Sequence, residues 1–188
     1  NAMPAWTAGA LSACAGDYLD RLRAHAAGRS RVVDKMPGNF AFIGLIAAML
    51  PGAKIVHTVR EPMATIWSNY STHFRDALHY TYDLDVLTRY YGEYRKTMSH
   101  WQTVLPEGRV FELRYEELVL SPEETLRRLL GYLDLEWTTA CLDFHEARQQ
   151  VRTASIAQVR QPLYTAAVDL WKNYRDRLAP YEAAVDPL

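Results

Sequence analysis

The apolar positions of the chain alternate between short continuous runs and helical spacings, and this pattern predicts an α/β fold. The runs at 31–34, 54–59 and 109–114 are typical of short buried strands. Stretches with helical spacing separate them, so the crossovers between strands would be helical and right-handed. We therefore expect one parallel sheet wrapped by helices. The length of 188 residues is ordinary for a single domain, 1–188.

Spacings of three and four residues predict helices at 11–26, at 40–50, over 83–101 and after three prolines. Asn39 is expected to cap the second helix, and Ser121 with Glu124 would form a capping box before the helix that Pro122 opens. The helix that begins at Pro62 has an apolar face made by Met63, Ile66, Trp67, Tyr70 and Phe74. The last helix follows Pro162, and its expected inner face is Leu163, Ala167, Leu170, Trp171, Tyr174 and Leu178.

Charge and cysteine usage narrow the classes of partner and compartment. A formal net charge of −1 argues against nucleic acid, which usually binds to a basic field. No apolar run approaches the length of about 20 residues that spans a bilayer, so we expect no membrane partner. Cys14 and Cys141 lack metal-site spacing, so a reducing cytoplasm is the expected compartment and no metal is expected. Asn1 and Ala2, before Met3, are interpreted as a tag remnant.

Arg60 ends the second predicted strand at the place where α/β proteins hold ligands, beyond the carboxyl end of a strand. If a helix starts at Pro62, Ser68 lies about 9 Å along its axis, within reach of an extended arginine. A guanidinium and a hydroxyl together can hold one phosphate. The alternative is a surface arginine paired with Glu61 or Asp34 and a serine that faces solvent.

Four segments in order, "VVDKMPGNF", "VREPMATIWS", "RYEELV" and "VRTASIAQVRQPLY", resemble the sulfotransferase family. The resemblance runs over 32–180 and is closest to bacterial sulfotransferase domains joined to tetratricopeptide repeats. It implies transfer of a sulfuryl group from 3′-phosphoadenosine 5′-phosphosulfate (PAPS) to a hydroxyl or amine. It also implies a fold similar to the P-loop nucleotide kinases, with a parallel sheet wrapped by helices.

The resemblance gives roles to individual residues. Arg60 and Ser68 would clamp the 3′-phosphate of PAPS. Lys35 would stabilise the negative charge that develops on the sulfonate and the leaving phosphate oxygen, although a salt bridge to Asp34 is the alternative. Tyr115 would stack near the adenine, or else pack on the core at a strand end.

The segment "VRTASIAQVRQPLY" is the part that the family folds over the cofactor. There Ser155 would touch the sulfonate end and Arg160 would add charge at the 3′-phosphate, whereas the alternative is a plain surface loop. The general base stays open. His57, His73 and His79 are candidates by residue type, and His57 inside a strand is more typical of a structural role.

The family also has a first strand and a phosphate-cradling loop rich in Gly, Arg and Ser/Thr, which the sequence before Lys35 does not contain. Gly9 and Gly16 follow no predicted strand. We therefore expect a fragment, ahead of a degenerate homologue or a protomer completed by association, and weak or absent catalysis by this chain alone. A noncatalytic remnant that binds PAPS or 3′,5′-ADP, or an assembly module, is the alternative. A kinase is disfavoured because no G-x-x-x-x-G-K-[ST] loop is present. The acceptor is not predicted, and a homodimer is left open.

Overall fold

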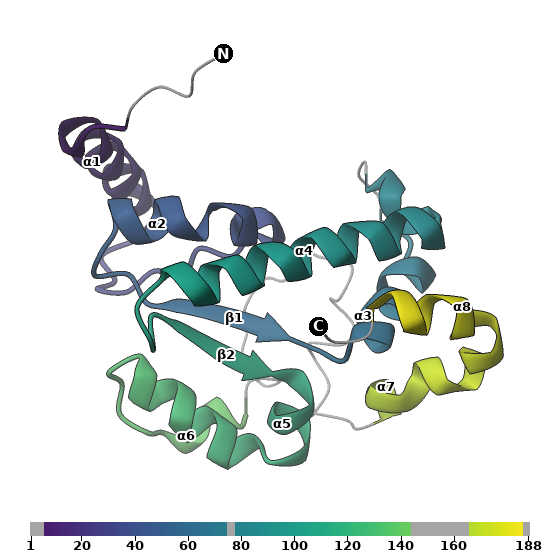
Figure 1. Ribbon diagram of the computed structural model, residues 1–188. Helices are drawn as coiled ribbons and strands as arrows, with labels where there is room; N and C mark the ends of the chain where they lie inside the picture. The colour runs from purple at the N-terminus through teal and green to yellow at the C-terminus, as the bar shows by residue number, and fades with distance from the viewer. Residues whose placement is uncertain (1–5, 75–77, 144–165, 186–188) are drawn as a thin grey trace. The chain divides into compact units, whose positions relative to one another are not determined.

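The computed structural model describes residues 6–74, 78–143 and 166–185 (Figure 1). The chain folds into two compact units. The first unit holds 1–53 with 97–106, and the second unit holds 54–96 with 107–188. Helix α4, Leu84–Val104, contributes residues to both. None of the helices in the described ranges is both long and apolar enough to span a bilayer.

The second unit contains the sheet, which is a parallel pair of strands. Strand β1 is Ile55–Val59 and strand β2 is Val110–Arg114. They pair in register from Ile55 opposite Val110 to Val59 opposite Arg114. Figure 1 shows α5 and α6 on one side of the two strands. On the other side, Tyr94 of α4 lies within hydrogen-bond distance of His57 of β1. The predicted α/β class with a parallel sheet wrapped by helices is confirmed, and both carboxyl strand ends lie at the same edge.

The predicted strand at 31–34 is wrong, because these residues form neither a strand nor a helix. The side chain of Val33 is 89% exposed, although its apolar run suggested burial. A strand needs a partner for its backbone N–H and C=O groups. The described part of the first unit contains no strand that could provide one. The sheet of the described residues therefore has two strands where the sequence suggested three.

Helices complete the second unit around the strand pair. The helix α3 follows β1, α5 and α6 follow β2, and a series of short helices leads to α8. Their bounds are α3 Pro62–Ser71, η2 His79–Tyr82, α5 Tyr115–Leu120, α6 Pro122–Tyr132, η3 Thr139–Cys141, α7 Ala166–Asp169, η5 Leu170–Tyr174 and α8 Arg175–Val185. The hydrophobic core is shared by α3, α4, η5 and α8, and contains Met63, Ala64, Ile66, Leu87, Tyr91, Trp171, Leu178 and Val185.

The hydroxyl of Tyr132 fastens the end of α6 to the start of both strands. It accepts a hydrogen bond from the N–H of Ile55 at 3.0 Å. Its own proton is shared between the carbonyls of Ile55 at 3.1 Å and Arg109 at 2.9 Å. These hydrogen bonds join the amino ends of the two strands. The candidate site lies at the opposite, carboxyl ends.

The predicted inner face of the last helix is only partly correct. Trp171 and Leu178 are buried as expected, but Leu170 is 50% exposed and Tyr174 is also exposed. The reason is that 170–174 form a 3₁₀-helix between two α-helices. Three residues per turn replace 3.6, so the side-chain directions drift away from the α-helical pattern. Leu163 and the side chain of Ala167 lie outside the described residues.

One predicted helix cap is wrong, and a second is correct in position but lacks its side-chain bond. Asn39 lies inside the 3₁₀-helix η1, Pro37–Phe42, and the residue that precedes α2, Ile43–Met49, is Phe42. Pro37 opens this tighter turn two residues before Asn39. Ser121 is the N-cap residue of α6, as predicted, but its side chain makes no capping hydrogen bond. Its backbone N–H donates to the carbonyl of Glu117 at 2.8 Å and closes α5.

The first unit is built from α1, Ala8–His25, the η1 and α2 turns, and the last part of α4. Thr7 caps α1 by accepting from the N–H of Ala10 at 3.2 Å. The indole of Trp101 donates to the carbonyl of Phe40 at 2.7 Å, and its ring lies against Gly44. Any side chain larger than that of glycine at position 44 would therefore have to displace the Trp101 ring.

Candidate functional site

The junction from β1 to α3 places Arg60 immediately after a strand and before a capped helix. Pro62 takes the first position of α3, and the Glu61 carboxylate caps the first turn. This carboxylate accepts from the N–H of Met63 at 3.1 Å and from the N–H of Ala64 at 2.5 Å. Such a cap satisfies amide groups that have no partner within the helix. The backbone at Arg60 is thus fixed on both sides.

Tyr115 follows β2 as Arg60 follows β1, and the parallel register brings the two side chains together. The guanidinium carbon of Arg60 lies 4.9 Å from the ring centroid of Tyr115. Contact between a guanidinium and an aromatic face is favourable and orients the planar cation. Arg60 and Tyr115, which the sequence analysis considered separately, therefore contact each other at the carboxyl edge of the sheet.

Ser68 lies on the polar face of α3, which begins beside Arg60. The hydroxyl of Thr65 lies 3.5 Å from the carbonyl of Arg60 and 3.0 Å from that of Glu61. Ser68 and Asn69 follow Thr65 by three and four residues and share its side of the helix, while Met63 and Ile66 face the core. Ser68 is half-buried on this face.

The donors at this edge fit a phosphate group. Arg60 offers a planar cation with several N–H groups, and Ser68 offers a hydroxyl on the adjacent helix face. Two carboxylates of this region, those of Glu61 and Glu116, accept hydrogen bonds from backbone amides. Glu61 caps α3, and Glu116 accepts from the N–H of Glu61 at 2.8 Å. Arg60 and Ser68 could therefore hold an anion such as a phosphate group at this edge.

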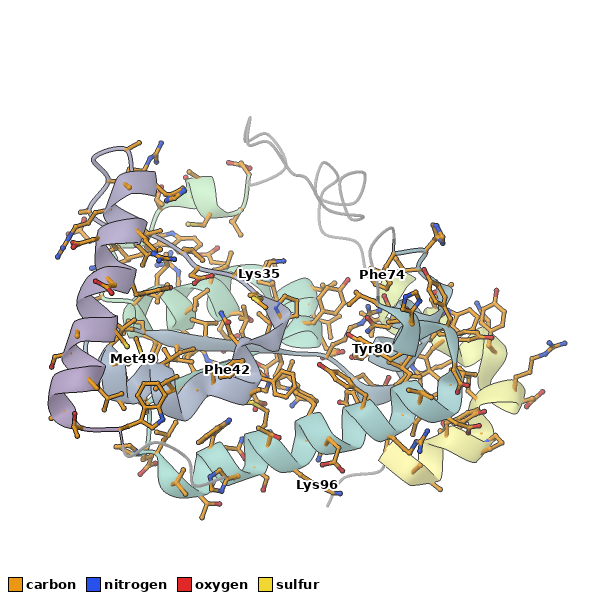
Figure 2. All side chains as sticks on the ribbon, turned by 90° about the horizontal axis from the view of Figure 1, so that it is seen from above. Lys35, Phe42, Met49, Phe74, Tyr80 and Lys96 are labelled. Atoms are coloured by element: carbon orange, nitrogen blue, oxygen red, sulfur yellow. The ribbon has the colours of Figure 1, made fainter. Side chains whose placement is uncertain are left out.

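Lys35 belongs to the first unit, where Figure 2 shows it on the segment between α1 and η1. Its side chain is exposed. Asp34, the expected salt-bridge partner, accepts a hydrogen bond from the hydroxyl of Tyr18 at 2.5 Å. This hydrogen bond, with some burial, raises the pKa of Tyr18 to about 12. Within the described ranges no ion pair involves Lys35.

The histidines that were considered as bases differ in their surroundings. His57 lies inside β1 as expected, and its Nε2 is within hydrogen-bond distance of the Tyr94 hydroxyl at 2.5 Å. Burial lowers the pKa of His57, and the Glu112 carboxylate partly opposes that shift. His73 is exposed with its ring near Tyr82. Ser155 and Arg160, together with Gln158, lie outside the described residues.

The capping role of Glu61 and the contact made by Glu116 were missed from the sequence. A Glu-Pro pair at a strand-to-helix junction is a local signal that could have indicated the first. The second could not be found in this way, since Glu116 and Glu61 are 55 residues apart. Among the described residues, no group of three His, Cys, Asp or Glu side chains could hold a metal ion.

Comparison with known proteins gives a family. The sequence profile of the sulfotransferase family matches residues 5–139. An uncharacterised protein of Aquifex aeolicus is 35% identical over 90% of this chain and 23% of its own length. The protein-tyrosine sulfotransferase of Drosophila melanogaster is 26% identical over 85% of this chain and 34% of its own. The omega-hydroxy-beta-dihydromenaquinone-9 sulfotransferase Stf3 of Mycobacterium bovis is 33% identical over 57% of this chain and 29% of its own.

A solved structure has the same fold. The sulfotransferase domain from the curacin biosynthetic pathway superposes with a TM-score of 0.62 at 17% identity, over 83% of this chain and 60% of that domain. The chain spans about a quarter to a third of the three curated relatives named above. The profile match covers well over half of the 188 residues. The chain therefore belongs to the sulfotransferase family.

Proposed function

We propose that this chain is a sulfotransferase domain that binds PAPS and contributes to transfer of its sulfuryl group to a hydroxyl or amine acceptor. The observation that supports this most directly is the arrangement at the carboxyl edge of the sheet. Arg60 follows β1, contacts the ring of Tyr115 after β2 at 4.9 Å, and lies beside the polar face of α3 that carries Ser68. This arrangement suits a nucleotide with a phosphate on its ribose.

The residues have separate roles in the proposal. Arg60 and Ser68 hold the 3′-phosphate, and Tyr115 contacts the adenosine. PAPS supplies the activated sulfuryl group when it is bound. Lys35 neutralises charge on the transferring sulfonate. Ser155 and Arg160 keep the cofactor-covering roles that the family resemblance implies. The acceptor would be the second partner, no metal is required, and the free thiols of Cys14 and Cys141 suit a reducing cytoplasm.

The noncatalytic alternative is favoured by one observation. Gly9 and Gly16 both lie within α1, in the middle of helical structure, and so neither forms a loop between a strand and a helix. The part of the family site that cradles the 5′-phosphosulfate has no counterpart in residues 6–34. We therefore expect the 188-residue chain alone to bind nucleotide but to transfer sulfate weakly or not at all.

Calorimetry with 3′,5′-ADP tests the binding half of the proposal. We expect the Arg60→Ala variant to weaken binding by at least about tenfold, because charge-assisted hydrogen bonds are lost. The matched control is Arg127→Ala, which removes an exposed arginine that pairs with Glu123 on α6 at 2.7 Å. Thermal melting without ligand is used to check that both variants are folded. No binding by the unmodified chain, or equal binding by Arg60→Ala, would overturn the proposed site.

Transfer from labelled PAPS to a panel of phenols, alcohols and amines separates an enzyme from a remnant. Binding of 3′,5′-ADP without transfer supports the noncatalytic alternative. Turnover that is lost in Lys35→Ala but kept in Lys96→Ala, an exposed lysine on α4, supports the catalytic role of Lys35. Efficient turnover by this chain alone would contradict the expectation of weak catalysis.

A further inference from the structure

The carboxylate of Glu116 reaches from α5 to the backbone of the β1–α3 junction. Its Oε1 accepts a hydrogen bond from the N–H of Glu61 at 2.8 Å, in a partly buried position. The two residues are 55 positions apart in sequence but follow neighbouring parallel strands. The contact therefore joins the two carboxyl strand ends directly, side chain to main chain.

The backbone N–H of Glu61 depends on a partner from elsewhere in the fold. Glu61 is the N-cap of α3, and amide groups at a helix start have no acceptor within the helix. The carboxylate of Glu61 serves the amides of Met63 and Ala64, two and three residues further on. Glu116 supplies the acceptor for the amide of Glu61. This amide belongs to the peptide unit that links Arg60 to Glu61, so holding it fixes the orientation of that peptide plane.

Consecutive residues of α5 thus contact both parts of the same dipeptide. The ring of Tyr115 lies against the guanidinium of Arg60, and Glu116 holds the following amide. The second carboxylate oxygen of Glu116, Oε2, is buried and has no hydrogen-bond partner among the described residues. Burying an oxygen in this way costs free energy that a solvent-facing glutamate would not lose. The intrinsic helix propensity of glutamate does not explain why this carboxylate is buried.

We propose that Glu116 is a positioning residue for the anion-binding arginine. It acts through the Arg60–Glu61 peptide and does not itself contact the ligand. By holding that peptide, Glu116 directs the Arg60 side chain along the face of Tyr115 and towards the polar side of α3. The inference rests on the proposed function of Arg60, but the contact with Glu61 can be measured without any ligand.

The experiment compares two variants of nearly equal size. Glu116→Gln keeps a carbonyl oxygen that can accept from the Glu61 amide, whereas Glu116→Met keeps the length of the side chain but has no such oxygen. Amide hydrogen exchange at Glu61, followed by NMR, reports the contact. Calorimetry with 3′,5′-ADP reports its consequence. The matched control is Glu117→Met, which alters the next residue of the same helical turn, where the carboxylate pairs with Arg128 at 2.9 Å.

We expect Glu116→Met to speed exchange at Glu61 and to raise the dissociation constant for 3′,5′-ADP by about tenfold each, the effect of one lost hydrogen bond to a charged group. Glu116→Gln should stay within about threefold of the unmodified chain in both measurements, since it retains the neutral form of the bond. Glu117→Met should leave both unchanged. If Glu116→Met does not fold, Glu116→Asp replaces it, because the shorter side chain cannot reach the amide.

The outcomes separate this inference from the proposed function. Faster exchange with unchanged affinity would show that Glu116 is only structural and would overturn the inference. Unchanged exchange in Glu116→Met would overturn the contact itself. If the unmodified chain binds no 3′,5′-ADP while exchange responds as expected, the contact stands but the proposed function fails, and the positioning role fails with it.

Discussion

His57 carries an imidazole in the middle of β1, where it contacts Tyr94 of α4. The two rings are tilted against each other at 5.7 Å between centroids. Burial lowers the pKa of His57, and the carboxylate of Glu112, its partner across the strand pair, partly opposes this. Burial also raises the pKa of Tyr94 to about 12. Both groups are therefore held in their neutral forms by the fold.

We predict that His57 makes the free energy of unfolding depend on pH below about 6.5. The unfolded chain takes up a proton at the ordinary pKa of histidine, while the folded chain does so only at a lower pH. The stabilising contribution is complete above the unfolded pKa and is lost as the pH falls towards the folded pKa. Urea unfolding between pH 7.5 and 5 should show a shallower decrease for His57→Gln than for the unmodified chain.

The control for this prediction is the unmodified chain, unfolded in the same buffers at each pH. Equal slopes for His57→Gln and the unmodified chain would contradict the assignment of a lowered pKa to His57.

At the scale of single elements, two helical glycines have opposite surroundings. A Cβ at Gly92, within α4, would meet no atom within 4 Å. A Cβ at Gly44, within α2, would lie 2.5 Å from Cζ3 and 2.8 Å from Cη2 of Trp101. The Trp101 ring cannot move aside freely, since its indole N–H is bonded to the carbonyl of Phe40. The same substitution should therefore have opposite effects in these two helices.

We predict that Gly92→Ala raises the free energy of unfolding by about 0.5–1 kcal/mol, the usual gain in helix propensity. Gly44→Ala receives the same gain but must displace Trp101. Overpacking of this kind costs about 1–3 kcal/mol, so the net effect should be destabilising. Urea unfolding monitored by circular dichroism gives both values. A Gly44→Ala variant as stable as Gly92→Ala would show that the Trp101 contact is not restrictive.

At the scale of the whole molecule, η5 and α8 pack against α3 and contribute to the same hydrophobic core. Leu178 of α8 is 1% exposed, and Trp171 is also buried. The ring of Tyr174 stacks on Trp67 of α3 with 4.0 Å between centroids. All four residues belong to the second unit, which also contains the β1–α3 junction. Packing of the C-terminal helices therefore supports the same helix that carries Ser68.

We predict that Leu178→Ala lowers the free energy of unfolding by about 2–5 kcal/mol, the range for truncation of a fully buried leucine. Leu170→Ala is the matched control because its side chain is half exposed. It should change the free energy of unfolding by about 0.5 kcal/mol or less. Equal losses in the two variants would contradict the described packing of α8 on α3.

Local signals in the sequence predicted most elements correctly. The alternation of apolar runs and helical spacings located β1 and β2 to within one residue, and the prolines at 62 and 122 marked the starts of α3 and α6. The position of Arg60 after β1 and of Tyr115 after β2 followed from the same pattern. These predictions succeeded because each depends only on neighbouring residues.

Predictions failed where a strand needed a partner far away in sequence and where an adjoining turn competed with a helix cap. Residues 31–34 have the composition of a strand, but a strand requires a neighbour for its backbone. Asn39 is a typical capping residue but lies inside the 3₁₀-helix η1, and Ser121 occupies the N-cap of α6 without a side-chain capping bond. In each case the local preference was real but too weak to decide the structure.

The sequence by itself determined the α/β class, the family resemblance and the placement of Arg60 and Tyr115 at strand ends. Only the tertiary structure decided that these two side chains meet, that Glu116 holds the Arg60–Glu61 peptide, and that Tyr132 secures the strands from behind. The physical reason is distance along the chain. Contacts between residues 55 or 77 positions apart arise from strand register and packing, which no local pattern of residues encodes.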